Sequence, residues 1–301
     1  MPATILTVNA GSTSLKRHLV EGDTSRPVDS YARADAVGHR VVHGGARFQK
    51  PTLIDDEVLA AIEELSPLAP LHNQPALTTI REAVAALPDV PHVAVFDTAF
   101  HASIPEEAAT YAIPRRWREE WAVRRYGFHG LAVQSVVAQL AVERLVVCHL
   151  GGGCSVTAVL GGRSADTTMG FSPLEGVPME TRSGSVDPGA LLYLLREHGL
   201  SVEDLDRALE HESGLVALGG LDDPLGFAVY TYRVACAVAQ MTTALGGLET
   251  LAFSGGVGEN RADVRDAVVG RLRFLGDFDV AVVPAREELV IAAAVRDLLG
   301  V

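Results

Sequence analysis

The sequence predicts an α/β protein made of two similar halves. Strand-like and helix-like segments alternate along its 301 residues, a pattern typical of sheets covered by helices. An apolar strand that turns through small residues into a second strand occurs at residues 4–20 and again at 144–159, where His149-Leu150-Gly151 corresponds to Asn9-Ala10-Gly11. This repeat indicates an internal duplication in which each domain contributes one hairpin to a shared cleft.

The elements of the first half follow from local patterns. Apolar runs predict a hairpin at residues 5–9 and 14–20 and buried strands at 37–42 and 92–97, since β-branched residues fit a pleated surface. Amphipathic spacing predicts helices over 55–65 and 72–87. Acidic residues at the start of the first of these helices complement the positive end of its dipole.

The second half repeats the alternation. A helix over 130–142 leads into the second hairpin, and Asp187-Pro188 begins a helix that runs through His198, as an N-cap followed by proline does. We expect a long buried helix over 224–245, strands over 248–254 and 280–283, and helices over 259–272 and 286–299.

The amino-acid composition excludes several classes of protein. A net charge of −13 opposes binding to nucleic acid or to membrane surfaces. The 48% hydrophobic content argues against disorder. The three cysteines show no metal or redox spacing, and no apolar stretch reaches the length of a membrane span. A cytoplasmic enzyme with reduced thiols is expected.

The first hairpin has the residues of a phosphate-binding loop. Ser12 and Ser14 offer hydroxyl donors and Lys16 a positive charge, while Gly11 permits a close turn. The spacing is not that of a Walker loop. Taken alone, the segment is about equally consistent with an ordinary Gly-Ser turn.

Five clusters between the elements carry chemistry-bearing side chains. Alone, a histidine at a helix start is usually a cap, and an Arg–Asp pair is usually a surface salt bridge. The clusters are at residues 38–45, 67–73, 93–101, 125–130 and 180–184.

Together these segments resemble the acetate kinase family of short-chain carboxylate kinases. The resemblance covers both ends and most of the middle of the chain, in order. It is carried by NAGSTSLK (9–16), GHRVVHGG (38–45), LAPLHN (68–73), VFDTAFH (95–101), RRYGFHG (124–130), HLGGGCSVTAV (149–159), DTTMGFSPLEG (166–176), TRSGSVDPG (181–189), SGGVGEN (254–260) and REELVIA (286–292).

The resemblance implies the fold and the reaction. The fold would be two duplicated ribonuclease H-like domains of the actin, Hsp70 and sugar kinase superfamily around a central cleft. Residues 1–101 with 286–301 would form the N-terminal domain, and residues 102–285 the C-terminal nucleotide-binding and dimerisation domain. ATP and acetate would react in line to give ADP and acetyl phosphate, with Mg²⁺ (or Mn²⁺) bound and the protein a homodimer.

The resemblance also assigns roles to single residues. Asp97 would orient either the substrate carboxylate or an arginine. The implied catalytic residues are Arg40, Asp97, His129, Arg182 and, as a supporting donor, His72. The implied acyl pocket is Arg40, Val42, Leu71, Phe128 and Pro173. The implied nucleotide contacts are Ser12, Ser14, Lys16, His149, Leu150, Gly151, Gly152, Gly153, Gly256, Val257, Gly258, Glu259 and Asn260. The implied metal ligands are Asn9 and Glu287, with Ser12.

The chain also departs from the family pattern. Gly152 stands where the family usually has asparagine, and residues 218–224 lack the arginine of the family's adenosine strap. A carboxylate kinase that acts on propionate or butyrate, or that uses another donor such as pyrophosphate, therefore remains open. A more remote alternative is a nucleotide-dependent switch protein with little turnover.

Overall fold

A computed structural model describes residues 3–10, 15–66 and 70–301, with the backbone alone for residues 70–72. The chain divides into two compact units. The first contains residues 1–102, 128–138 and 285–301, and the second contains residues 103–127 and 139–284. The first unit thus takes in residues 128–138, which the expected boundaries assign to the second domain. Those boundaries stay a prediction.

The first unit contains a six-stranded sheet in the order β3-β2-β1-β4-β6-β5. Strands β1 and β2 pair antiparallel, as the hairpin pattern predicts, β3 pairs antiparallel with β2, and β1, β4 and β6 run parallel. The parallel strands therefore end at one edge of the sheet. The strands are β1 (Ile5–Ala10), β2 (Leu15–Glu21), β3 (Thr24–Pro27), β4 (Ala36–Val41), β5 (Thr52–Leu53) and β6 (His92–Phe96).

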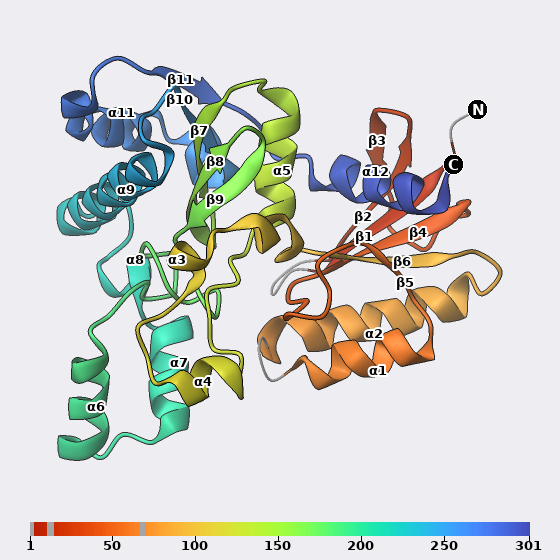
Figure 1. The fold of residues 1–301 in the computed structure, drawn as a ribbon, viewed down its shortest axis with the longest axis horizontal. Coiled ribbons are helices and arrows are strands. Elements are labelled where there is room, and N and C mark those ends of the chain that lie inside the picture. Colours follow the sequence, from red (N-terminus) through yellow and green to blue (C-terminus); the bar gives the residue numbers. More distant parts are fainter. Residues whose placement is uncertain (1–2, 11–14, 67–69) are drawn as a thin grey trace. The chain divides into compact units, whose positions relative to one another are not determined.

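Helices cover both faces of this sheet (Figure 1). Ile5 packs with residues of α12 (Glu287–Leu299), whereas its neighbour Leu6 belongs to the cluster on the other face, because successive strand residues point to opposite faces. Helices α1 (Asp56–Glu64) and α2 (Pro70–Ala86) pack on that other face. A Cβ at Gly38 would lie 2.5 Å from Ile291 Cγ2, so the missing side chain allows α12 to approach β4.

The second unit repeats this plan. Its five-stranded sheet has the order β11-β10-β7-β8-β9. Strands β7, β8 and β9 pair antiparallel, and β7, β10 and β11 run parallel. Read from β9, the order matches β3-β2-β1-β4-β6 strand for strand, in agreement with the expected duplication. The strands are β7 (Arg144–Leu150), β8 (Cys154–Leu160), β9 (Arg163–Thr167), β10 (Thr250–Ser254) and β11 (Asp279–Val282).

Helix α9 (Pro224–Leu245) packs against the sheet of the second unit. Its predicted bounds are correct: Asp223 caps its N-terminus, and Gly246, at φ 65°, ends it. Its predicted burial is partial: residues such as Tyr230 and Val234 are buried, whereas Tyr232 and Leu225 are 51% and 61% exposed. Sequence hydrophobicity alone does not reveal which apolar side chains of this helix stay exposed: Arg271 lies over the Tyr232 ring, 5.7 Å from its centroid, yet half of Tyr232 remains accessible.

The helix expected over 259–272 is instead two helices, the first of which begins directly after β10. No helix formed by the described residues is long and apolar enough to cross a membrane. The remaining helices are η2 (Ala99–Ser103), α3 (Glu106–Ala109), α4 (Arg115–Glu119), α5 (Gly130–Gln139), α6 (Pro188–Glu197), α7 (Val202–His211), α8 (Gly214–Ala217), α10 (Gly255–Asn260), α11 (Ala262–Arg271) and η3 (Arg273–Leu275).

Candidate active site

A cluster of four polar residues lies at the carboxyl edge of the first sheet. Asn9 is near the end of β1, Arg40 is in β4, Asp97 directly follows β6, and Glu287 begins α12. Arg40 Nε and Nη2 donate to Asp97 Oδ2 at 3.2 and 2.5 Å, and Nη1 donates to Asn9 Oδ1 at 3.1 Å. Asn9 Nδ2 donates to Glu287 Oε2 at 2.7 Å. The structure thus brings together four of the predicted site residues.

The charges in this cluster keep Arg40 ionised. Burial lowers the pKa of the Arg40 guanidinium, but the carboxylates of Asp97 and Glu287 raise it by more, so that it stays above its usual value. Asp97 is 1% exposed, and its other oxygen accepts a hydrogen bond from Leu131 N. Both oxygens of Asp97 are thus occupied by protein donors, Arg40 on one and Leu131 N on the other.

The start of α5 is packed directly against Asp97. A Cβ at Gly130 would lie only 2.0 Å from the Asp97 carbonyl oxygen, so only glycine fits there. The preceding residue, His129, has φ 59°, a conformation that non-glycine residues seldom adopt. Such local strain is often found at functional sites.

Two of the apolar residues expected near the carboxylate are buried in the first unit, whereas Pro173 is buried in the second. Val42 and Phe128 are 2% and 1% exposed, and the Phe128 ring meets the edge of His43 with centroids 5.3 Å apart. Asn73, fully buried in α2, accepts from His43 N and donates to His43 O, both at 3.1 Å. This double contact fixes the residue that follows Val42.

Some of the predicted site residues are not described by the structure, and one lies on a neighbouring strand. Ser12 and Ser14 lie outside the described residues, as do the side chains of Leu71 and His72. Lys16 is exposed on β2, directly across from Asn9 in the strand register. Its side chain therefore shares a sheet face with Asn9.

The two predicted nucleotide segments are neighbours in the second unit. The hairpin β7–β8 turns at residues 151–153, and Gly255 begins α10. A Cβ at Gly255 would lie 2.6 Å from the Leu150 carbonyl, and a Cβ at Gly151 would lie 3.8 Å from Gly256 N. Gly255, whose φ is 79°, therefore lets the helix start approach the turn, whereas the space at Gly151 would admit a Cβ. Glu259 accepts a hydrogen bond from Gly255 N at 2.9 Å.

An acidic side chain lies beside the turn. Glu180 N donates to Gly152 O at 3.3 Å, and a Cβ at Gly152 would lie 3.4 Å from Glu180 Oε2. A side chain at position 152 would therefore fit with a small movement of that carboxylate.

Arg182 makes two contacts with the protein, one through Nη1 and one through Nε. Its side chain is 14% exposed, Nη1 donates to Pro173 O at 3.0 Å, and Nε lies 3.5 Å from Glu210 Oε2. Among the described residues, its other N–H groups have no protein acceptor. An anion can therefore bind to the remaining donors.

Arg125 stabilises the loop that contains Pro173 through several hydrogen bonds. Its Nη1 lies within 2.8 to 3.1 Å of the carbonyls of residues 167–169, and Nη2 donates to Glu175 Oε1 at 3.2 Å. Glu175 also accepts from the Tyr111 hydroxyl. Burial and this carboxylate raise the pKa of Tyr111, which therefore stays a donor.

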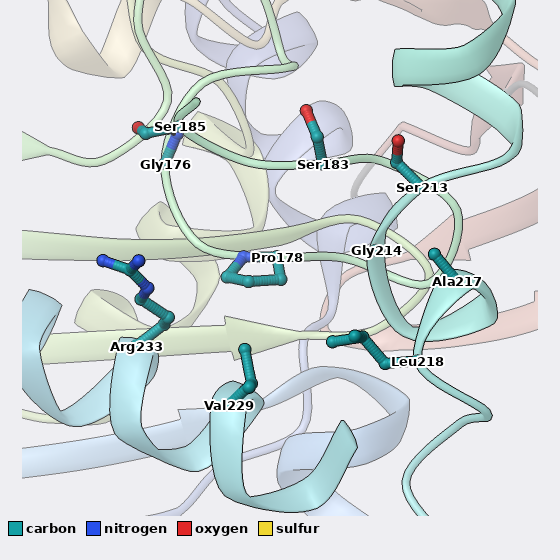
Figure 2. Close-up of a pocket in the computed structure, with 10 residues that line it drawn as sticks. All are labelled: Gly176, Pro178, Ser183, Ser185, Ser213, Gly214, Ala217, Leu218, Val229 and Arg233. Atoms are coloured by element: carbon teal, nitrogen blue, oxygen red, sulfur yellow. Dashed lines mark hydrogen bonds between the residues drawn. The ribbon is translucent and has the colours of Figure 1, made fainter. Parts of the chain in front are cut away.

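A cavity of about 290 Å³ is lined in part by Ser183, the residue that follows Arg182 in the sequence (Figure 2). Ser183 and Ser185 contribute hydroxyls to its lining, and Arg233 is the one charged residue among the ten that line it. Ser185 Oγ accepts from Gly176 N at 3.1 Å, which joins the two ends of the loop.

Sequence reasoning missed Glu210, Glu175 and Asn73. Asn73 could have been found beside His72 in a motif already singled out. The signal for Glu210 is a carboxylate in the last turn of a helix, where the dipole disfavours it. Nothing in the sequence indicates that Glu175 contacts Arg125.

Comparisons with known proteins identify close relatives. The sequence model of the Acetokinase family matches residues 23–290. An acetate kinase from Synechococcus sp. (strain JA-2-3B'a(2-13)) is 48% identical over 269 residues, which cover 81% of this chain and 66% of that relative. The chain thus spans slightly less than two thirds of the length of that curated relative.

Solved structures agree along nearly the whole chain. A propionate kinase from Francisella tularensis subsp. tularensis SCHU S4 has a TM-score of 0.90 and 31% identity, covering 98% of this chain and 99% of that one. An acetate kinase from Porphyromonas gingivalis has a TM-score of 0.88 and 30% identity, with the same coverage. These structural similarities confirm the fold class expected from the sequence.

Proposed function

This chain belongs to the acetokinase family, and on that premise we propose that it transfers the γ-phosphoryl group of ATP to acetate, giving acetyl phosphate and ADP. The observation that carries the proposal is the Arg40 cluster. A partly buried guanidinium, held by Asp97 and Asn9, retains the second hydrogen of each Nη for a ligand. A planar guanidinium suits a carboxylate or a phosphoryl group.

The chemistry requires positioning more than proton transfer. Acetate is already ionised at neutral pH, so no strong general base is needed. The transition state is loose, and its charge lies on the equatorial phosphoryl oxygens, which cations and other donors stabilise. We assign this stabilisation to Arg182 and His129, with His72 in support. Arg40 binds the carboxylate, and Asp97 holds Arg40.

Magnesium fits the donors at the edge of the first sheet. Among the described residues, no group of three or more histidine, cysteine or acidic residues could hold a metal. Mg²⁺ does not need such a cage, because it binds through one or two carboxylates, substrate phosphates and water. Glu287 and Asn9, with Ser12, supply such oxygens. The ion would neutralise charge on the phosphates.

We assign the nucleotide to the second unit. Its phosphates would lie against Gly151, Gly152 and Gly153 and residues 256–260, with Lys16 as a neutralising charge. Gly151 N already donates to Gly153 O at 3.0 Å, so we assign the phosphate hydrogen bonds of this turn to the amides of Gly152 and Gly153. His149 and Leu150 precede this turn. The absence of an arginine in residues 218–224 supports a donor held mainly by its phosphates. A donor other than ATP, such as pyrophosphate, is the alternative.

The size of the acid is set by the apolar residues Val42, Leu71, Phe128 and Pro173. One methylene in such a pocket is worth only about 1 to 3 kcal/mol. Propionate and butyrate are therefore alternative substrates, and one of the similar structures is that of a propionate kinase.

We further infer a homodimer that works in the cytoplasm. The exposed apolar side of α9, with Leu225 and Tyr232, supports a subunit contact, which sedimentation velocity would test. The cysteines are unpaired, and burial raises the pKa of the Cys148 and Cys154 thiols, so they remain protonated.

A hydroxamate assay tests the proposed reaction. The purified chain is incubated with acetate, Mg²⁺ and, in turn, ATP, GTP or pyrophosphate, and acyl phosphate is trapped with hydroxylamine. The proposal expects product with ATP. Product with pyrophosphate alone would favour the alternative donor, and nucleotide binding without product would favour the switch protein.

A further inference from the structure

Resting on the function proposed above, we propose that Glu210 is a positioning residue that fixes the Arg182 guanidinium for phosphoryl transfer. Glu210 pairs with Nε of Arg182, while the Pro173 carbonyl accepts from Nη1. These two contacts hold adjacent sides of one planar group. The guanidinium therefore cannot rotate without losing one of them.

The backbone around Arg182 is joined to the same helix end. Thr181 Oγ1 donates to Glu210 O at 2.8 Å, and Ser183 N donates to Leu209 O at 3.0 Å. The residues on both sides of Arg182 are thus bonded to the last turn of α7. Arg182 and Glu210 are therefore held in place by the same group of hydrogen bonds.

The backbone around Arg182 is also closely packed, so it has little room to move. Met179 N donates to Arg182 O at 3.0 Å, and Leu215 N donates to Met179 O at 2.8 Å. A Cβ at Gly214 would lie 2.3 Å from Met179 O and 2.6 Å from Arg182 O. Gly214 also has φ 66°, so glycine alone fits there.

Glu210 is poorly placed to stabilise its own helix. It lies in the last turn of α7, where the negative end of the dipole repels a carboxylate. Its side chain is only 13% exposed, so it also loses hydration. Burial raises the pKa of Glu210, and Arg182 opposes that rise. Its principal compensation is the contact with Arg182.

Releasing this contact gives Arg182 rotational freedom that must be lost again in the transition state. The entropy of a long side chain corresponds to roughly a tenfold effect on rate. Nucleotide binding should change little, because the turn at 151–153 and α10 are untouched.

The first test compares Glu210→Gln with Glu212→Gln. Glu212 lies two residues further on, is exposed and pairs only with Arg207 among the described residues. We expect Glu210→Gln to lower kcat about tenfold with the nucleotide KM within about twofold. Glu212→Gln should match the wild-type protein. If Glu210→Gln does not fold, Glu210→Asp, which withdraws the charge by one methylene, should show the same fall in kcat.

The second test is chemical rescue, which a merely structural role of Glu210 would not affect. Millimolar guanidinium chloride should restore part of the kcat of Arg182→Ala, because Glu210 and the Pro173 carbonyl bind the free cation. It should restore much less in the double variant Arg182→Ala/Glu210→Gln.

Equal kcat in the Glu210 and Glu212 variants, or equal rescue with and without Glu210, would overturn the inference. Failure of the wild-type chain to make acyl phosphate would instead overturn the proposed function, and this inference with it.

Discussion

Arg40 has an unusual degree of support for a single side chain. Its partner Asn9 comes from β1, Asp97 from the residue directly after β6, and Glu287 from the start of α12. A guanidinium held in this way loses little side-chain entropy when it binds an anion.

The two arginines should give different kinetic defects. Arg182→Ala should lower kcat far more than it raises the nucleotide KM, because its contact strengthens in the transition state. Arg40→Ala should also raise the KM for the carboxylate. Steady-state kinetics with each substrate varied separately makes the comparison. Near-wild-type turnover in both variants would refute the assigned roles.

The buried pair His39 and His92 predicts a pH-dependent stability. Their rings stack with centroids 5.3 Å apart, and Nε2 of His39 lies 3.0 Å from Nδ1 of His92. Burial, and then His92, lower the pKa of His39 from 6.5 to about 3. The unfolded chain therefore takes up the proton first as pH falls. Stability is full above pH 6.5 and declines below it, by about 2 kcal/mol at pH 5 from His39 alone.

The variant His39→Gln removes this titration. Urea unfolding at pH 7 and pH 5 should show a smaller difference in the free energy of unfolding for the variant than for the wild-type protein. Equal differences in the two proteins would show that His39 is not the group responsible.

At the level of elements, the site depends on where strands end and helices begin. Asp97 follows β6, and α5 starts against its carbonyl at Gly130. The Arg40 cluster is therefore sensitive to small movements of a helix that contributes none of its charges.

Gly130→Ala should reveal this sensitivity. The added methyl must displace α5 or Asp97, and overpacking of this kind destabilises a protein by about 1 to 3 kcal/mol. We expect a lower melting temperature and a raised carboxylate KM. Gly270→Ala is the matched control, because its Cβ would meet nothing within 4 Å and it lies in a helix. That variant should keep wild-type kinetics and gain up to about 1 kcal/mol. Similar behaviour of the two variants would contradict the packing argument.

The sequence patterns of strands and helices predicted much of the fold, and the motifs predicted several individual residues of the site. Apolar runs predicted β1 and β6, and the cap Asp187-Pro188 predicted the start of α6. The sequence did not reveal the short strands β3 and β5, since two to four residues of polar composition carry no periodic signal. Nor did it reveal that Asp97 binds Arg40 or that Glu210 binds Arg182, because each pair is formed by the tertiary fold between separate elements.

At the level of the whole molecule, the two sheets share one strand order but differ in chemistry. The first has charged side chains at its carboxyl edge, centred on Arg40. The second has backbone amides from glycines 151–153 at the corresponding position. A protein with a net charge of −13 must concentrate its cations locally to bind anionic substrates.

Donor selectivity follows from this division. Because residues 218–224 lack an arginine and Gly152 offers no side chain, the nucleotide base should contribute little. ATP, GTP and ITP should give kcat/KM values within about tenfold of each other, since a hydrogen-bonded base contact is worth on the order of 1 kcal/mol. A preference for ATP of a hundredfold or more would show that another segment, such as residues 256–260, recognises adenine.

The central claim is that this chain moves a phosphoryl group from ATP to a carboxylate bound by Arg40. The most direct test is ³¹P NMR of the wild-type protein and Arg40→Ala in ATP, Mg²⁺ and acetate. In the wild-type sample, the γ-phosphoryl signal should be replaced by an acetyl phosphate signal in step with the appearance of ADP, and this conversion should be strongly reduced in the variant. Inorganic phosphate without acetyl phosphate, or equal conversion by both proteins, would contradict it.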